Sequence, residues 1–410
     1  MTFKGQEERD CMKKFVIAST AVLLLSTFSL ALAADFAPGV SLGLSEGYND
    51  NVLLTRTNRD GSFVTYVSPG ASFDLRSAVS DLKVAYTPTF NFYESNSSLN
   101  TTSHNATLDG HYDVSDKLAL TINDLFEKSK GISGLLAVPN LGPIASIENL
   151  LTNTATGGAS YKIANELTWT VGGSYIYSNL SASNSVIGTA YSNIYSATSG
   201  LAYKLNPRST VSVNAQYEAN EFSTGNDSNN QYYTLGLTHK FTPTLTLAIT
   251  GGAALSEAKN SNNQATDFIG SADLTEKFEK STAVLSIAQT IAPGIEYSQP
   301  LKTQTAAFSL TRPLSERWTT GVQGSYMLFR SVPIVFASGS NVPFVKGEEL
   351  RFGGNVGYKI LPWASVGLSY NFINHLDKTG GTGNYYNNIA LLTFTLSLER
   401  PRAEAKPPSE

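Results

Sequence analysis

The chain has 410 residues, of which 41% are hydrophobic and 15% are charged, and its formal net charge is −4 at pH 7. Soluble proteins carry about 25% charged residues, so the composition disfavours an ordinary soluble surface. The slightly acidic balance disfavours a nucleic-acid partner, which requires a basic surface. The only cysteine, Cys11, precedes a predicted cleavage site, which excludes disulfides, thiolate ligands and a cysteine nucleophile from the mature chain.

The first 33 residues have the pattern of an export signal. Lys13 and Lys14 form a positive segment, residues 15–30 form an apolar core, and Ala31-Leu32-Ala33 is a small-residue cleavage site. Acidic and basic residues before Met12 do not fit this pattern, so residues 1–33 are predicted to be an over-called start plus a cleavable signal peptide. The alternative is an uncleaved signal anchor, although the apolar run is short for a spanning helix.

Apolar and polar residues alternate along many short stretches after residue 33. The clearest examples are Leu118–Asn123, Leu167–Gly172, Val211–Glu218, Leu245–Thr250 and Leu392–Glu399. A two-residue period predicts β-strands with one apolar and one polar face. No helical stripe of comparable length appears, so the sequence predicts an all-β chain.

Short turns and long loops alternate between these stretches. The short turns are Ser77–Asp81, Ser115–Lys117, Ala164–Glu166, Asn206–Ser209, Thr242–Thr244, Glu279–Ser281, Leu314–Glu316 and Leu361–Trp363. The long loops include Tyr48–Gly61, Ser95–Thr102, Lys128–Thr152, Ser223–Asn229, Ala258–Asn263, Arg330–Lys346 and Asp377–Asn384. Tight periplasmic turns and roomy extracellular loops are typical of outer-membrane barrels.

Residues 34–400 are therefore predicted to form a closed antiparallel transmembrane β-barrel of about 16–18 strands, with both termini on the periplasmic side. Residues 401–410 are predicted to be a disordered periplasmic tail. A soluble sandwich or propeller is the alternative. It is disfavoured because no helices are available to cover the apolar faces, and because aromatic residues such as Trp318 and Trp363 cluster near strand ends.

One part of the sequence resembles a known family. Tyr48-Asn49-Asp50-Asn51-Val52-Leu53-Leu54-Thr55, Val67-Ser68-Pro69-Gly70, Tyr86-Thr87-Pro88 and Tyr93 are similar to porin-like bacterial outer-membrane β-barrels, some of them associated with exopolysaccharide and surface-protein gene clusters. The resemblance is sharpest over roughly residues 39–127, and its motifs are structural. It implies a barrel in the bacterial outer membrane. The last strand departs from such barrels because Phe394 lies inside it and Glu399 follows.

Candidate catalytic groups are few. His104, Asp109 and His111 share one predicted strand, but no nucleophile elbow accompanies them, and His104 and His111 point to opposite faces of a regular strand. Asn49-Asp50-Asn51 is interpreted as an ordinary turn, with a hard cation such as Ca²⁺ as the weaker alternative. We therefore expect no enzyme, no catalytic residue, no metal site and no cofactor.

The long loop Lys128–Thr152 is unusually apolar, and it is predicted to join strands 5 and 6. Its candidate constriction or cap residues are Ile132, Leu135, Leu136, Val138, Leu141, Ile144 and Glu148. Such a loop either packs inside the lumen or forms an oligomer contact. The loop Arg330–Lys346, with Val332, Ile334, Val335 and Phe336, carries the same two interpretations. Candidate lumen charges are Asp74, Arg76, Lys83, Asp109, Glu218 and Arg351, together with Asp273, Lys277 and Lys359.

The leading functional prediction is passive diffusion of small polar solutes across the bacterial outer membrane, with weak charge selectivity because both signs are present. The alternatives are an export or anchoring barrel for an exopolysaccharide or surface apparatus, a barrel sheath around an electron-transfer partner, and an outer-membrane enzyme. Expected partners are outer-membrane lipid, the barrel insertion machinery and a second copy of the chain.

Overall fold

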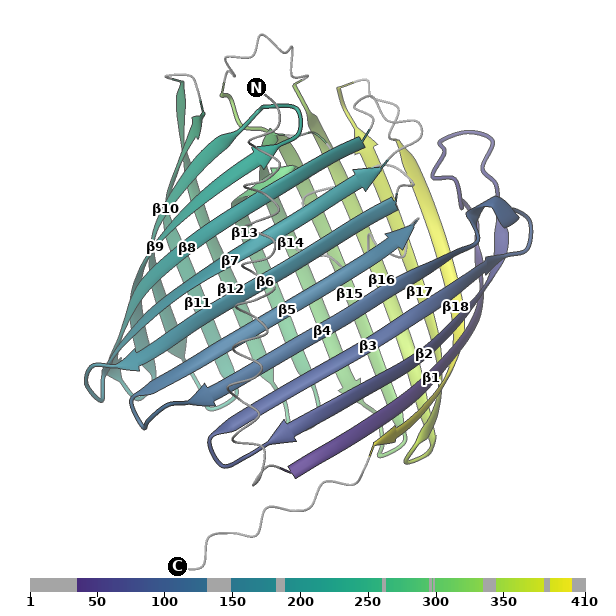
Figure 1. The fold of residues 1–410 in the computed structure, drawn as a ribbon, viewed down its shortest axis with the longest axis horizontal. Helices are drawn as coiled ribbons and strands as arrows, with labels where there is room; N and C mark the ends of the chain where they lie inside the picture. The colour runs from purple at the N-terminus through teal and green to yellow at the C-terminus, as the bar shows by residue number, and fades with distance from the viewer. Residues whose placement is uncertain are drawn as a thin grey trace, which may run out of the picture.

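The computed structural model describes residues 35–130, 149–181, 189–259, 263–294, 297, 299–334, 344–379 and 384–399. Within these ranges, 18 strands form one antiparallel sheet in which every strand pairs with its neighbours in the sequence. β1 also pairs with β18, so the sheet closes on itself as a barrel (Figure 1). Closure removes both sheet edges, as a sheet in lipid requires.

The strands have the following bounds: β1 Asp35–Asn49, β2 Ser62–Arg76, β3 Ser80–Tyr93, β4 Thr101–Asp113, β5 Leu118–Lys130, β6 Asn149–Lys162, β7 Leu167–Ser181, β8 Thr189–Asn206, β9 Ser209–Phe222, β10 Ser228–Lys240, β11 Leu245–Ala258, β12 Gln264–Lys277, β13 Thr282–Gly294, β14 Gln299–Pro313, β15 Trp318–Ser331, β16 Lys346–Leu361, β17 Ala364–Asp377 and β18 Tyr385–Glu399. A single 3₁₀ turn, η2 Ser97–Leu99, lies between β3 and β4 within the described residues. Among these residues, no helix is long and apolar enough to cross a membrane.

The eight predicted short turns all fall between strands at the same end of the barrel, and the strand number is 18 rather than 16. The predicted limits of the apolar loop were wrong, because residues 128–130 belong to β5 and residues 149–152 belong to β6. Extended pairing continues there, since Lys128 lies opposite Leu151. The connections after β7 and after β13 were not among the named long loops, although Ser183-Asn184-Ser185 and Pro293-Gly294 are turn-forming patterns.

Strand register separates an outer face from an inner face, since directly paired residues face the same side and the next pair faces the other. On β10 and β11, Asn230 and Ser256 pair with each other and are buried inside the barrel. The alternate positions carry Leu235, which is 66% exposed, and Leu237. Large exposed apolar side chains recur in this way on every strand pair, so the outer surface suits lipid. Trp318 and Trp363 lie near strand ends, as the sequence predicts.

The interior is packed more tightly at one end than at the other. Inward side chains near the long loops, such as Asn91, Thr152, Ser192 and Asn387, are almost completely buried. Inward side chains near the short turns are exposed or half-buried, for example Thr246. Short turns mark the periplasmic end. The lumen is therefore open towards the periplasm and filled towards the outside.

Candidate functional site in the lumen

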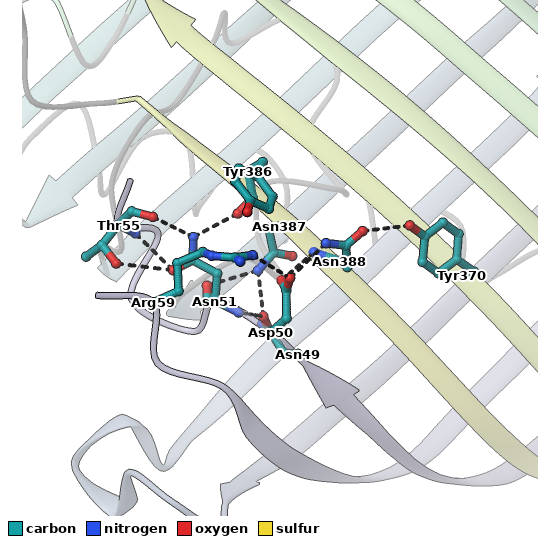
Figure 2. A network of polar contacts seen from close by, with 9 residues as sticks. All are labelled: Asn49, Asp50, Asn51, Thr55, Arg59, Tyr370, Tyr386, Asn387 and Asn388. Carbon is teal, nitrogen blue, oxygen red and sulfur yellow. Dashed lines mark hydrogen bonds and ion pairs between the residues drawn. The ribbon is translucent and has the colours of Figure 1, made fainter. Parts of the chain in front are cut away.

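The barrel closes at its extracellular end through a network of buried amides between β1 and β18 (Figure 2). The Asn387 amide donates to Asn49 Oδ1 at 2.5 Å and to the Asn51 carbonyl at 2.9 Å. The Asn51 amide donates to the Tyr386 carbonyl at 2.7 Å and to the Thr55 carbonyl at 2.8 Å. Buried amides are stabilising only when their donors and acceptors are paired, so this network fixes the start of the β1–β2 loop against the last strand.

A second, half-exposed layer of the same network lies outside these amides. Both carboxylate oxygens of Asp50 accept from Asn388, one from its backbone N–H and one from its side chain. Arg59 donates to the same carboxylate at 2.9 Å, and its guanidinium lies 4.1 Å from the centre of the Tyr386 ring. The Asn49-Asp50-Asn51 segment is thus a structural clamp, and it donates and accepts hydrogen bonds within the chain.

The β1–β2 loop turns into the lumen beyond this clamp. Leu54, with a φ of 51°, is 5% exposed and packs in one apolar cluster with residues of two separated walls. One wall contributes Leu150 of β6 and Leu180 of β7, and the other contributes Ile373 and Ile389 of β17 and β18. Six strand steps separate β18 from β6 around the barrel. The cluster therefore spans the lumen near its extracellular end.

The described part of the loop between β15 and β16 also packs inward. Val332 and Ile334 are buried against Ala254 of β11, Ile269 of β12 and Ile291 of β13. Ala254 occupies an inward position, directly opposite Tyr232. The described contacts thus match the lumen interpretation of this loop, whereas Val335 and Phe336 lie outside the described residues.

A buried charged group lies between these two apolar clusters. Glu349 accepts a hydrogen bond from Arg351 Nε at 2.6 Å and from His375 Nδ1 at 3.1 Å. The His375 ring lies between Phe329 and Tyr385, at centroid distances of 5.5 and 5.4 Å. The charges of Glu349 and Arg351 offset each other, which is the condition under which ionised groups are tolerated in a buried site.

The nine predicted lumen charges all occupy inward positions in the register, and Asp273, Lys277 and Lys359 lie towards the short turns of β12 and β16. The remaining six fall into two groups. Asp74, Arg76, Lys83 and Asp109 lie in the periplasmic part of β2–β4, and Lys83 is directly opposite both Asp74 and Asp109. The other two lie in the extracellular part. Glu218 accepts hydrogen bonds from Asn220, Asn230 and Tyr232, and Arg351 bonds Glu349. The predicted set is therefore divided between the two ends of the lumen.

The periplasmic mouth is electrically polarised. On β2–β4 the inward acids Asp74, Asp81, Asp109 and Asp113 outnumber the inward cations Arg76 and Lys83. On the wall that continues from β4 round to β12, the strands β6, β8, β10 and β12 each carry an inward lysine at or close to the last residue: Lys162, Lys204, Lys240 and Lys277. All four are exposed and none forms an ion pair within the described part of the chain. We call these four residues the lysine arc.

The sequence prediction included Lys277 and missed the other three lysines of the arc. The sequence does contain a signal, because each lysine lies within two residues of the end of a strand that leads into a short turn. Its meaning depends on knowing which positions face inward. The predicted cap residues Ile132, Leu135, Leu136, Val138, Leu141, Ile144 and Glu148 lie outside the described residues. His104 and His111 face opposite sides, and the described residues contain no cluster of three metal-ligating side chains.

These features together define an outer-membrane β-barrel: a closed sheet with an apolar outer face, a polar lumen and short turns at one end. No protein-family model and no curated relative matches the chain. Several Pseudomonas aeruginosa structures are similar to it. OccK2 (OpdF) in complex with glucuronate is 12% identical, with 89% of this chain and 98% of that chain covered and a TM-score of 0.48.

OpdK with vanillate is 10% identical, with 89% of this chain and 99% of that chain covered and a TM-score of 0.47. OccK9 (OpdG) is 13% identical over the same shares, with a TM-score of 0.46. Identity and TM-score are low in all three comparisons. The function proposed for this chain therefore depends on its own geometry.

Proposed function

We propose that this barrel is a porin-like conduit through which small polar solutes cross the bacterial outer membrane by diffusion, without chemistry. The observation that carries the proposal is the polarised periplasmic mouth, where the acids of β2–β4 occupy one side of an open lumen and the lysine arc runs from β6 to β12, which lies opposite β3. Barrels of 16–18 strands are wide enough to leave an aqueous channel. Charges that served only to stabilise the wall would be expected to pair with neighbours, and the arc lysines form no ion pair with a described residue.

Opposed arcs of charge create a field across the mouth. In a confined lumen with low-dielectric walls, such a field acts over longer distances than it would at an exposed surface. Polar and zwitterionic solutes align with this field, whereas apolar solutes gain nothing from it. Because the two arcs offset each other, we expect the wild-type pore to be only weakly selective between small anions and cations.

Ion selectivity in planar bilayers tests the proposal. The purified barrel should produce discrete open steps, and the reversal potential in a salt gradient should be close to zero. The variant K162Q/K204Q/K240Q/K277Q should become cation-selective because only the acidic arc remains. The matched variant D74N/D81N/D109N/D113N should become anion-selective.

Two results would contradict the proposal. Silent bilayers with correctly folded protein would favour an occupied or gated barrel, such as one that exports or anchors a surface polymer or encloses an electron-transfer partner. Open steps whose selectivity changes in neither variant would show that the mouth does not control passage. A variant that affects stability alone is recognised by its altered heat-dependent migration on a gel.

A further inference from the structure

Three basic residues lie side by side on the outer face of the barrel, at the extracellular ends of β15, β16 and β17. Arg330 is directly opposite Lys346 in the β15–β16 register. The backbone N–H of Lys378 donates to the Lys346 carbonyl at 2.8 Å, which continues the row onto the end of β17. All three are exposed. We call these residues the basic row.

The basic row points away from the lumen. Phe329 and Gly347, the next pair in the register, are buried inside the barrel, so Arg330 and Lys346 face outwards. Lys378 extends to the same side, because its ammonium bonds the outward carboxylate of Glu348 at 2.6 Å. The Tyr326 hydroxyl donates to that carboxylate at 2.8 Å.

The charge of the row is not balanced by the protein. Directly opposite side chains in a sheet have Cβ atoms about 4.5–5.5 Å apart, and like charges at that distance are destabilising. Glu348 neutralises Lys378 and raises the pKa of its ammonium. Neither Arg330 nor Lys346 forms an ion pair with a described residue. The neighbouring strand β14 adds no negative charge next to Arg330. The residue opposite Arg330 is Lys302, and its ammonium forms an ion pair with Asp267 at 2.7 Å.

Beyond the Glu348 carboxylate, the surface below the row is apolar and exposed. Leu328 on β15 and Leu350 and Phe352 on β16 are outward residues, 37%, 41% and 45% exposed. An occupant of this surface would therefore present anionic oxygens to Arg330 and Lys346 and hydrocarbon to the side chains beneath. Arginine and lysine beside an apolar band provide charge-assisted hydrogen bonds to phosphate.

We propose that the basic row is a binding site for a phosphorylated glycolipid of the outer leaflet, of the lipid A type, with a headgroup phosphate between Arg330 and Lys346 and acyl chains along Leu328 and Leu350. A free phosphate ion would use the same two cations without the apolar surface. The proposal does not depend on an open pore, since the site lies outside the barrel.

Native mass spectrometry of the full barrel in detergent tests the site. The probes are diphosphoryl lipid A, the same lipid with its phosphates removed, and inorganic phosphate. Wild-type protein should retain diphosphoryl lipid A and bind the other two at least about tenfold more weakly, the loss expected for a charged hydrogen bond. The variant R330Q/K346Q/K378Q should lose this preference, and the single variant K346Q should lose part of it if the triple variant fails to fold.

The matched control is K204Q/K240Q/K277Q, which removes the same charge from inward positions at the opposite end and should bind lipid A like the wild type. Equal losses in both triple variants would overturn the proposal in favour of general electrostatic attraction. Retention of inorganic phosphate as strongly as lipid A would overturn the lipid assignment. Retention of the dephosphorylated lipid as strongly as lipid A would show that the cations have no role.

Discussion

At the residue scale, the Asn49-Asp50-Asn51 segment shows how one motif serves the closure of the whole sheet. Asn387 donates to Asn49 Oδ1 and to the Asn51 carbonyl, and Asn388 donates to the Asp50 carboxylate, so the partners of the segment lie near the other end of the chain. The sequence placed the segment in a turn and could not identify its partners. A pairing between residues separated by more than 330 positions leaves no local pattern, because the strand register alone brings the two together.

Asn387→Ala should weaken this closure. The substitution removes both donors of a buried amide and leaves Asn49 Oδ1 and the Asn51 carbonyl without that partner. Asn49 Oδ1 still accepts from the Asn51 N–H and the Asn51 carbonyl from the Leu54 N–H, so the loss is two hydrogen bonds of about 0.5–1.5 kcal/mol each. Thermal unfolding in detergent should show a lower midpoint for Asn387→Ala, whereas Asn165→Ala, at an exposed turn position, should unfold like the wild type. Equal midpoints would indicate that the β1–β18 backbone pairing alone closes the barrel.

At the element scale, the strands and the short turns could be predicted, and the inward course of the loops could not. Alternation of apolar and polar residues has a fixed period and a fixed physical cause, so it identified β5, β7, β9, β11 and β18 directly. Leu150 was assigned to a loop because it lies beside an apolar run, although it pairs with Ser129. A loop residue such as Leu54 belongs to no periodic pattern. Its burial depends on contacts with strands that are distant in the sequence.

Leu54→Ala should open the extracellular end of the lumen. Its side chain joins the β6–β7 wall to the β17–β18 wall, and its removal leaves a gap between them. We expect a larger single-channel conductance and a stability loss of about 2 kcal/mol or more, as is typical of buried leucine truncations. Leu53→Ala is the matched control, because Leu53 is 38% exposed in the same loop. If both variants conducted like the wild type, Leu54 would not restrict the passage.

At the scale of the whole molecule, the barrel is asymmetric from end to end. Its periplasmic part is wide and charged, and its extracellular part is filled by buried amides and apolar clusters. This asymmetry could not be predicted from a strand such as β11, since its inward positions carry similar small residues along their whole length. On β11, for example, inward Ala248 and inward Ser256 differ little in sequence, yet Ser256 is 2% exposed and Ala248 is half-buried.

Cysteine labelling can measure this asymmetry directly, because the only cysteine, Cys11, precedes the predicted cleavage site, and replacing it also excludes a thiol on uncleaved precursor. In a Cys11→Ser background, Ala248→Cys should react quickly with a bulky maleimide, since it faces the open periplasmic lumen. Ser256→Cys lies eight residues along the same strand on the same inner face and should react much more slowly. Adding Leu54→Ala should accelerate the reaction at position 256 and leave position 248 unchanged. Equal rates at the two positions would show that the lumen is open along its whole length. The packing at the extracellular end would then not restrict the passage of solutes.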